Sequence, residues 1–198
     1  MWWLYRFLVL LLSPLWLLVL AVKQRGQARW RERLGFSPRR DDAPIWIQAV
    51  SVGEVRIAIR LAARLKELGF PAAITSTTAA GLDLAQSEGA AELTPSALPL
   101  DLPSCTRRAL ASLDPRALVL VETEVWPALF REARSRGVPV FIVNARLSDR
   151  AFGRTLRFRG LYERALRDAH VAAQSEEHAA RFKLLGACAG RVHVLGNL

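Results

Sequence analysis

The chain has 198 residues, 52% of them hydrophobic, and its 28 Lys and Arg against 18 Asp and Glu give a formal net charge of +10. This length allows one sizeable core, or one domain with a membrane anchor. The basic excess favours anionic partners such as nucleic acid, acidic lipid or phosphorylated substrates. Two distant cysteines, Cys105 and Cys188, and three scattered histidines argue against a disulfide framework and against a metal site.

The N-terminal segment has the pattern of a membrane anchor. Residues 7–22 are apolar except for Ser13 and Pro14, and a basic cluster follows them. The apolar run lies near the lower limit for a spanning helix, about 17–25 residues, and the basic flank predicts that its C-terminal side faces the cytoplasm. A cleaved signal peptide is the alternative, but only one basic residue precedes the apolar run and no cleavage-site pattern is evident. We therefore expect residues 1–36 to form a retained anchor with a basic juxtamembrane segment, either spanning the bilayer or lying in one leaflet.

Residues 37–43 are typical of a linker, and strand-like and helix-like segments alternate after it. Apolar runs predict strands at Ile45–Val50, Ala72–Thr75, Ala91–Leu93, Ala117–Val121, Val138–Val143, His170–Ala173 and Arg191–Val194. Helical patterns with glycine and proline boundaries predict helices at Val55–Leu68, Leu82–Ser87, Leu102–Leu113, Trp126–Arg136, Leu156–Arg167 and Glu176–Leu185. Repeated β-α-β order with apolar, non-alternating strands predicts a parallel sheet covered on both faces, so residues 44–198 are expected to form a Rossmann-like domain. The sequence has no G-x-G-x-x-G, Walker, RNA-binding aromatic or zinc-knuckle motif, and no nucleic acid partner is expected.

The most informative segment is Ser51-Val52-Gly53-Glu54, which follows the first expected strand. Gly53 would permit a tight turn and a close approach of the backbone to a ligand. Glu54 would then lie in the first turn of a helix, at the sheet edge where open α/β sheets bind ligands, and could act as a base or bind a hydroxyl group. The alternative is helix capping, with Ser51 or Gly53 as the cap and Glu54 complementing the helix dipole.

Two acidic residues follow the expected strand at Ala117–Val121, namely Glu122 and Glu124. Because the carboxyl ends of parallel strands meet at one sheet edge, their carboxylates and that of Glu54 are expected to converge on one cleft. Carboxylates gathered there can share general-base and substrate-orienting work. The alternative for Glu124 is a structural role in capping the next helix.

Other strand ends carry residues suited to an anionic ligand. Asn144 and Arg146 follow the fifth expected strand, where the arginine could bind a phosphate or carboxylate and the amide could add hydrogen bonds; a turn with a surface arginine is the alternative. Thr77 and Thr78 offer hydroxyl groups and helix N-terminal amides for an anion, and an ordinary N-cap explains them equally well. A run of arginines either faces anionic lipid or a phosphorylated substrate, or is a solvated face: Arg146, Arg150, Arg154, Arg157 and Arg159.

Together these segments resemble the N-terminal half of the 3-deoxy-D-manno-octulosonic acid (Kdo) transferases of Gram-negative bacteria. The resemblance covers essentially the whole chain, and its most specific parts are Ser-Val-Gly-Glu at residues 51–54 and Glu-Thr-Glu-Val-Trp-Pro at residues 122–127. The anchor with its basic flank also matches, as do residues 47–50, 75–81, 98–101, 144–148, 173–176 and 196–198.

The resemblance implies a glycosyltransferase B fold with two Rossmann-like halves. It implies transfer of Kdo from CMP-Kdo to a lipid A precursor, lipid IVA, at the cytoplasmic face of the bacterial inner membrane. Glu54 matches the proposed catalytic base, which takes the proton of the acceptor hydroxyl as its oxygen attacks the anomeric carbon with inversion, and Glu124 matches an orienting or alternate acid. The expected substrate-binding residues are Ser51, Gly53, Thr77, Thr78, Asn144 and Arg146. No metal and no cofactor is implied.

The sequence departs from the family in two ways. Gln48 stands where many members have histidine, and Ala128 where asparagine is common. In this family the N-terminal half meets the acceptor and the C-terminal half holds most of the nucleotide. The C-terminal nucleotide-binding domain is absent from these 198 residues, so we expect residues 1–198 alone not to catalyse transfer. The alternatives are a non-catalytic membrane module that binds anionic lipid and another envelope glycosyltransferase of the same fold.

Overall fold

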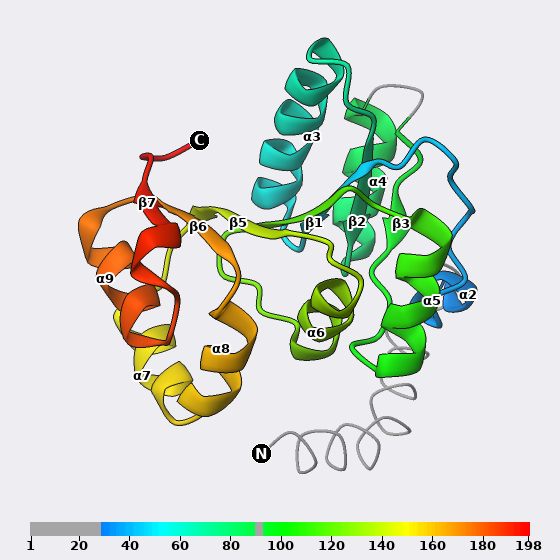
Figure 1. Ribbon diagram of the computed structural model, residues 1–198. Helices are drawn as coiled ribbons and strands as arrows, with labels where there is room; N and C mark the ends of the chain where they lie inside the picture. Colours follow the sequence, from blue (N-terminus) through cyan, green and yellow to red (C-terminus); the bar gives the residue numbers. More distant parts are fainter. Residues whose placement is uncertain (1–28, 90–92) are drawn as a thin grey trace.

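The domain is built on one parallel sheet of seven strands, ordered β3-β2-β1-β4-β5-β6-β7 (Figure 1). The computed structural model describes residues 29–89 and 93–198. The strands are β1 (Ile45–Ala49), β2 (Ala72–Ser76), β3 (Ser96–Ala97), β4 (Ala117–Val121), β5 (Val140–Ala145), β6 (His170–Ala173) and β7 (Val192–Val194). Every neighbouring pair is parallel, which confirms the predicted α/β architecture.

Helices cover both faces of this sheet (Figure 1). One face carries α3 (Val52–Glu67) and α4 (Ala79–Glu88), and the other carries α5 (Pro103–Leu113), α6 (Pro127–Ser135), α8 (Arg159–Leu166) and α9 (Glu176–Leu184). The remaining elements are α2 (Trp30–Arg33), α7 (Asp149–Leu156) and the short 3-10 helix η1 (Ala189–Arg191).

The apolar, non-alternating strands are explained by burial on both faces. Successive side chains of a strand point to opposite faces, so Trp46 joins the core under α5 and α6 while Ile47 joins the core under α3. In the same way Leu118 and Val119 of β4 belong to different cores, and all four side chains are at most 7% exposed. A polar side chain at any of these four positions would be buried away from water.

Three observed elements, β3, α7 and α8, differ from those expected. The strand expected at Ala91–Leu93 falls largely outside the described residues, and the third strand is instead Ser96–Ala97, a two-residue edge strand without an apolar run. The helix expected at Leu156–Arg167 is the shorter α8, and α7, which precedes it, was not predicted. Ser148 caps α7 by accepting the Ala151 N–H at 3.3 Å, and the chain breaks at Phe158, whose φ of −115° is not helical.

The segment just before the expected linker is part of the folded domain. The Glu32 carboxylate of α2 accepts the Ala97 N–H at 2.6 Å, and the Arg33 carbonyl accepts the Leu100 N–H at 2.8 Å. These contacts attach α2 to the edge strand β3, so the domain begins earlier than the boundary predicted at residue 44. The anchor expected within residues 1–28 lies outside the described residues. In residues 29–89 and 93–198, no helix combines the length and apolar composition needed to cross a membrane.

Candidate active site

The candidate site lies where the strand order reverses direction. The chain builds β1, β2 and β3 outward on one side and then returns to place β4 on the other side of β1. Ligands of open α/β sheets bind beyond the carboxyl ends of the strands at such a switch point. Glu54 follows β1, and Glu122 and Glu124 follow β4, so the acidic residues leave the two strands that flank the reversal.

Ser51 and Glu54 form a reciprocal capping box at the start of α3. The Ser51 hydroxyl accepts the Glu54 N–H at 3.2 Å, while the Glu54 carboxylate accepts the Ser51 N–H at 3.3 Å and the Val50 N–H at 2.9 Å. The capping interpretation is therefore confirmed. Both carboxylate oxygens are held by the backbone, and Glu54 is only 8% exposed, so its position is fixed before any ligand arrives.

Gly53 does not form the tight turn predicted for it. It lies inside α3 without a positive φ, and the turn out of β1 is made at Ser51, which has an extended backbone with φ −83° and ψ 161°. A Cβ added at Gly53 would meet only the Ser51 hydroxyl, at 3.9 Å. Gly53 therefore leaves open space beside the first turn of α3. It matters for the candidate site because it has no side chain, and not because it adopts an unusual backbone conformation.

Glu124 has a proton affinity well above that of an ordinary carboxyl group. Burial and, after it, the nearby charges of Glu54 and then Glu122 together raise its pKa to about 7. A carboxyl group that titrates near neutral pH can both accept and return a proton. The structure thus places a second carboxylate close enough to Glu54 for their charges to interact.

Backbone strain gathers at the ends of β4 and β5. Glu122 has a φ of 67° and Asn144 a φ of 53°, left-handed conformations that few non-glycine residues adopt, at a cost of about 1–3 kcal/mol each. The pairing of β5 with β6 is also irregular between Ile142 and Ala145. Such distortions concentrate at functional sites because they redirect side chains at the end of a strand.

These strained residues are tied to Arg146 and to the C-terminal segment. The Arg146 Nε donates to the Glu122 carboxylate at 2.9 Å, and the Thr123 hydroxyl bonds to the Arg146 carbonyl. Asn144 is buried, and its Oδ1 accepts the Leu198 N–H at 3.0 Å. Arg146 itself is exposed, and within the described residues its terminal nitrogens carry no hydrogen bond. Glu122 therefore orients Arg146, and the terminal guanidinium nitrogens remain available to donate hydrogen bonds to an anion.

The two threonines predicted near the site have different environments. The Thr78 hydroxyl donates to the Val50 carbonyl at 2.8 Å and accepts the Gly81 N–H at 3.1 Å, so Thr78 caps α4 and ties it to the end of β1. Gly81 is needed for this contact, since an added Cβ would come within 2.8 Å of the Thr78 hydroxyl. Thr77 is half-buried, and its carbonyl accepts a hydrogen bond from the Arg33 guanidinium at 3.0 Å.

Two supporting residues of the site were not found by sequence reasoning. Asp101 accepts the N–H groups of Ala128 and Leu129, at 3.1 and 2.8 Å, and so caps α6 from a distant segment. Buried Gln48 accepts a hydrogen bond from the Thr75 hydroxyl, which in turn accepts the Trp46 indole N–H at 2.8 Å. Both contacts join residues far apart in the sequence, so no local sequence pattern predicts them.

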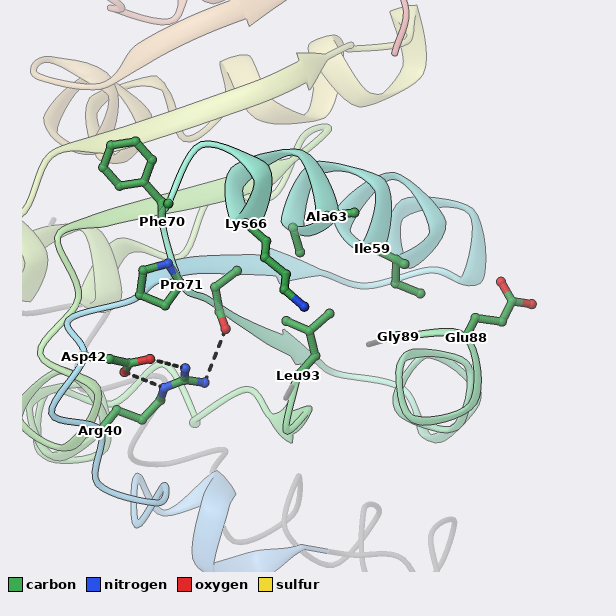
Figure 2. Close-up of a pocket in the computed structure, with 13 residues that line it drawn as sticks. Arg40, Asp42, Ile59, Ala63, Lys66, Phe70, Pro71, Glu88, Gly89 and Leu93 are labelled. Atoms are coloured by element: carbon green, nitrogen blue, oxygen red, sulfur yellow. Dashed lines mark hydrogen bonds and ion pairs between the residues drawn. The ribbon is translucent and has the colours of Figure 1, made fainter. Parts of the chain in front are cut away.

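A pocket of about 660 Å³ lies away from these residues, at the opposite end of the strands (Figure 2). Its lining includes Ala72, the first residue of β2, and the preceding Pro71, and Figure 2 shows Arg40 paired with Asp42. None of the predicted site residues lines it. In the part of the chain that the structure describes, no three His, Cys, Asp or Glu side chains gather so as to hold a metal ion.

Comparison with known proteins identifies the family. A family model described as 3-deoxy-D-manno-octulosonic-acid transferase (kdotransferase) matches residues 28–198. The chain belongs to the Kdo transferase family. The match begins two residues before α2, in agreement with the packing of that helix against the domain.

Curated Kdo transferases are longer than this chain. The chain is 39% identical over 197 residues to 3-deoxy-D-manno-octulosonic acid transferase of Bordetella pertussis, covering 89% of this chain and 45% of the relative. It is 31% identical over 204 residues to the Haemophilus influenzae protein of the same name, covering 98% of this chain and 48% of that one. The chain therefore spans about half the length of the curated Kdo transferases it matches.

Solved structures of similar fold include sugar-nucleotide enzymes. A Staphylococcus aureus MnaA–UDP structure aligns with a TM-score of 0.57 and 14% identity, over 78% of this chain and 45% of that chain. UDP-GlcNAc 2-epimerase of Neisseria meningitidis bound to UDP-GlcNAc aligns with a TM-score of 0.55 and 15% identity, over 78% of this chain and 46% of that one. At these identities the likeness shows the fold alone.

Proposed function

We propose that this chain is the acceptor-side half of a Kdo transferase that moves Kdo from CMP-Kdo to a lipid A precursor, lipid IVA, at the cytoplasmic face of the inner membrane. Membership of the family supports the reaction class. The observation that carries the proposal is the pair of carboxylates, Glu54 and Glu124, that flank the switch point between β1 and β4.

In the proposed reaction an acceptor hydroxyl oxygen forms a bond to the anomeric carbon of Kdo. The bond from that carbon to the phosphate oxygen of CMP breaks, and CMP leaves with the electron pair, so the configuration inverts. The hydroxyl proton passes to Glu54, which its capping box holds in place. Glu124 orients the acceptor or takes the proton in its turn, because a pKa of about 7 makes it a stronger base than an ordinary carboxylate.

The surrounding residues would bind the acceptor and contribute no covalent step. Gly53 leaves room beside Glu54, and Ser51 is exposed next to it. Arg146 offers terminal nitrogens to a phosphate of the lipid A precursor, while Asn144 sets the backbone that carries Arg146. Thr77 lies at the end of β2, beside these groups along the sheet edge, and Thr78 fixes that end through Val50.

The donor would be bound by a second domain, since the curated relatives are about twice as long as this chain. We expect the 198-residue chain to be inactive alone and to transfer Kdo when mixed with the C-terminal half of the Bordetella pertussis relative. The assay follows release of CMP and formation of Kdo-lipid IVA.

Glu54→Gln should abolish transfer in this mixture while retaining one acceptor for the capping box. Glu67→Gln, at the exposed far end of the same helix, is the matched control and should leave the rate unchanged. Kdo transfer by the 198-residue chain alone would refute the division of labour. Activity with a UDP-sugar but not with CMP-Kdo would identify a different envelope glycosyltransferase.

A further inference from the structure

An exposed cluster of arginines and large apolar side chains lies at the junction of α7 and α8. We call it the α7–α8 patch, and its members are Arg150, Arg154, Leu156, Arg157, Phe158 and Arg159. All six are exposed, and Leu156 and Phe158 retain 41% and 58% of their surface. Figure 1 shows both helices on the side of the sheet away from α3, near the β5–β6 end.

The orientation of the patch is fixed by the other side of α7. Ala151 and Phe152 pack against the main core, and the buried Thr155 hydroxyl donates to the Ala151 carbonyl at 2.7 Å. These contacts hold one face of α7 inward, so the opposite face and the α7–α8 turn must point outward. The exposed apolar residues are thus held in place by a packed helix.

The charge of the patch is not balanced by its neighbours. In residues 29–89 and 93–198, no ion pair joins any of its four arginines to a carboxylate. The nearby Asp149 is bound to Arg181, and Glu163 lies one turn further along α8. The patch therefore presents four positive charges around two exposed apolar side chains.

We propose that the α7–α8 patch docks onto an anionic lipid bilayer. Arginine side chains attract the acidic headgroups, while Leu156 and Phe158 can insert at the boundary between headgroups and acyl chains, where aromatic and aliphatic groups are stabilised. A soluble anion would leave these two apolar residues in water. The combination of charge and apolar surface therefore favours a membrane.

Docking at this patch would give the domain an attachment point that does not depend on its N-terminal segment. The segment enters the domain through α2 at the β3 edge, whereas α7 and α8 connect β5 to β6 near the other end of the sheet. Because α7 begins just after Asn144 and Arg146, docking also brings the bilayer close to the carboxyl edge of the sheet. Two separated contacts would fix how the candidate site faces the membrane.

The test places an environment-sensitive fluorophore on the patch of the full 198-residue chain. In a Cys188→Ser background, in which Cys105 is buried, Phe158→Cys is labelled and compared with Leu68→Cys at the end of α3. Leu68 and Phe158 are each 58% exposed, so the two sites are matched before membrane is added. Both proteins are mixed with phosphatidylglycerol vesicles and with phosphatidylcholine vesicles.

We expect a blue shift at position 158 with phosphatidylglycerol vesicles, a much smaller shift with phosphatidylcholine, and none at position 68. Adding Arg157→Gln with Arg159→Gln should lower the ratio of docked to undocked label about 25-fold, at about fivefold per arginine near an anionic surface. The matched control, Arg56→Gln with Arg60→Gln on α3, should leave this ratio unchanged.

Three results would overturn the proposal: equal shifts at both positions, no difference between the two lipids, or a shift at position 158 with an RNA oligonucleotide and not with vesicles. The readout is the environment of the label, not transfer of Kdo. Failure of docking and failure of the proposed reaction are therefore distinguishable.

Discussion

Replacing Glu124 with glutamine should stabilise the domain at neutral and alkaline pH. Folding raises the pKa of Glu124 from 4.5 to about 7. Below pH 4.5 the folded and unfolded states both hold the proton. Between pH 4.5 and 7 the unfolded chain loses it while the folded state retains it, so the free energy of unfolding falls as the pH rises. Above pH 7 both states are ionised and the full penalty remains.

The size of this effect follows from the difference in proton affinity. The interval between 4.5 and about 7 corresponds to about 3 kcal/mol, at 1.36 kcal/mol for each tenfold change in proton affinity. This is a large fraction of the total stability of a domain, usually about 5–15 kcal/mol. Glutamine has nearly the same shape and no acidic proton to lose. The free energy of unfolding of Glu124→Gln should therefore not decrease between pH 4.5 and 7 through this position.

Urea unfolding of both proteins at pH 4, 5, 6, 7 and 8 measures the effect. The difference in unfolding free energy between Glu124→Gln and wild type should grow by up to about 3 kcal/mol from pH 4 to pH 8. Glu176→Gln, at an exposed position in the first turn of α9, should show no comparable growth. A difference for Glu124→Gln that stays constant with pH would refute the burial and charge repulsion inferred for this carboxylate.

Three further outcomes are expected. In the mixture with the C-terminal half from Bordetella pertussis, the transfer rate should rise about tenfold per pH unit below pH 7 and level off above it, if ionised Glu124 is needed. Glu124→Gln should remove this rise of the rate with pH. A rise that is unchanged in Glu124→Gln would mean that another group causes it. Asp101→Ala should lower the free energy of unfolding by about 0.5–2 kcal/mol because α6 loses its cap, and Asp101→Asn should recover most of it in thermal unfolding. Gly81→Ala should destabilise the domain, since its Cβ would lie 2.5 Å from the Ser76 hydroxyl, whereas Gly53→Ala should raise stability by up to about 1 kcal/mol. Equal melting temperatures for the two alanine variants would contradict the packing described around Gly81.

Local patterns were sufficient to predict most of the sheet and to place the acidic residues after β1 and β4. Apolar runs such as that of β4 mark strands buried on both faces, and the Ser51 to Glu54 spacing marks a capping box whose partners are neighbours in sequence. The two-residue strand β3 was missed because backbone pairing with β2 and contacts from α2 hold it, not an apolar run.

The features missed at the site depend on residues far apart in the chain. The cap of α6 by Asp101 joins segments 27 residues apart, so no local motif could indicate it. The left-handed backbone at Glu122 is likewise accompanied by a hydrogen bond from its N–H to the Val143 carbonyl. The raised pKa of Glu124 arises from burial and from Glu54, which only the folded sheet brings near. Sequence identified these acidic residues, but their electrostatic coupling required the structure.

The attachment of α2 to β3 has a consequence for solubility. An uncovered edge strand offers unpaired backbone groups to another chain, and natural proteins block such edges with charge or with a covering element. Here the Glu32 carboxylate occupies the Ala97 N–H, so a short charged helix closes the end of the sheet. A chain shortened to begin at Pro44 would keep every strand yet lose this cover. We expect it to self-associate through β3, with the sheet extending from one molecule into the next.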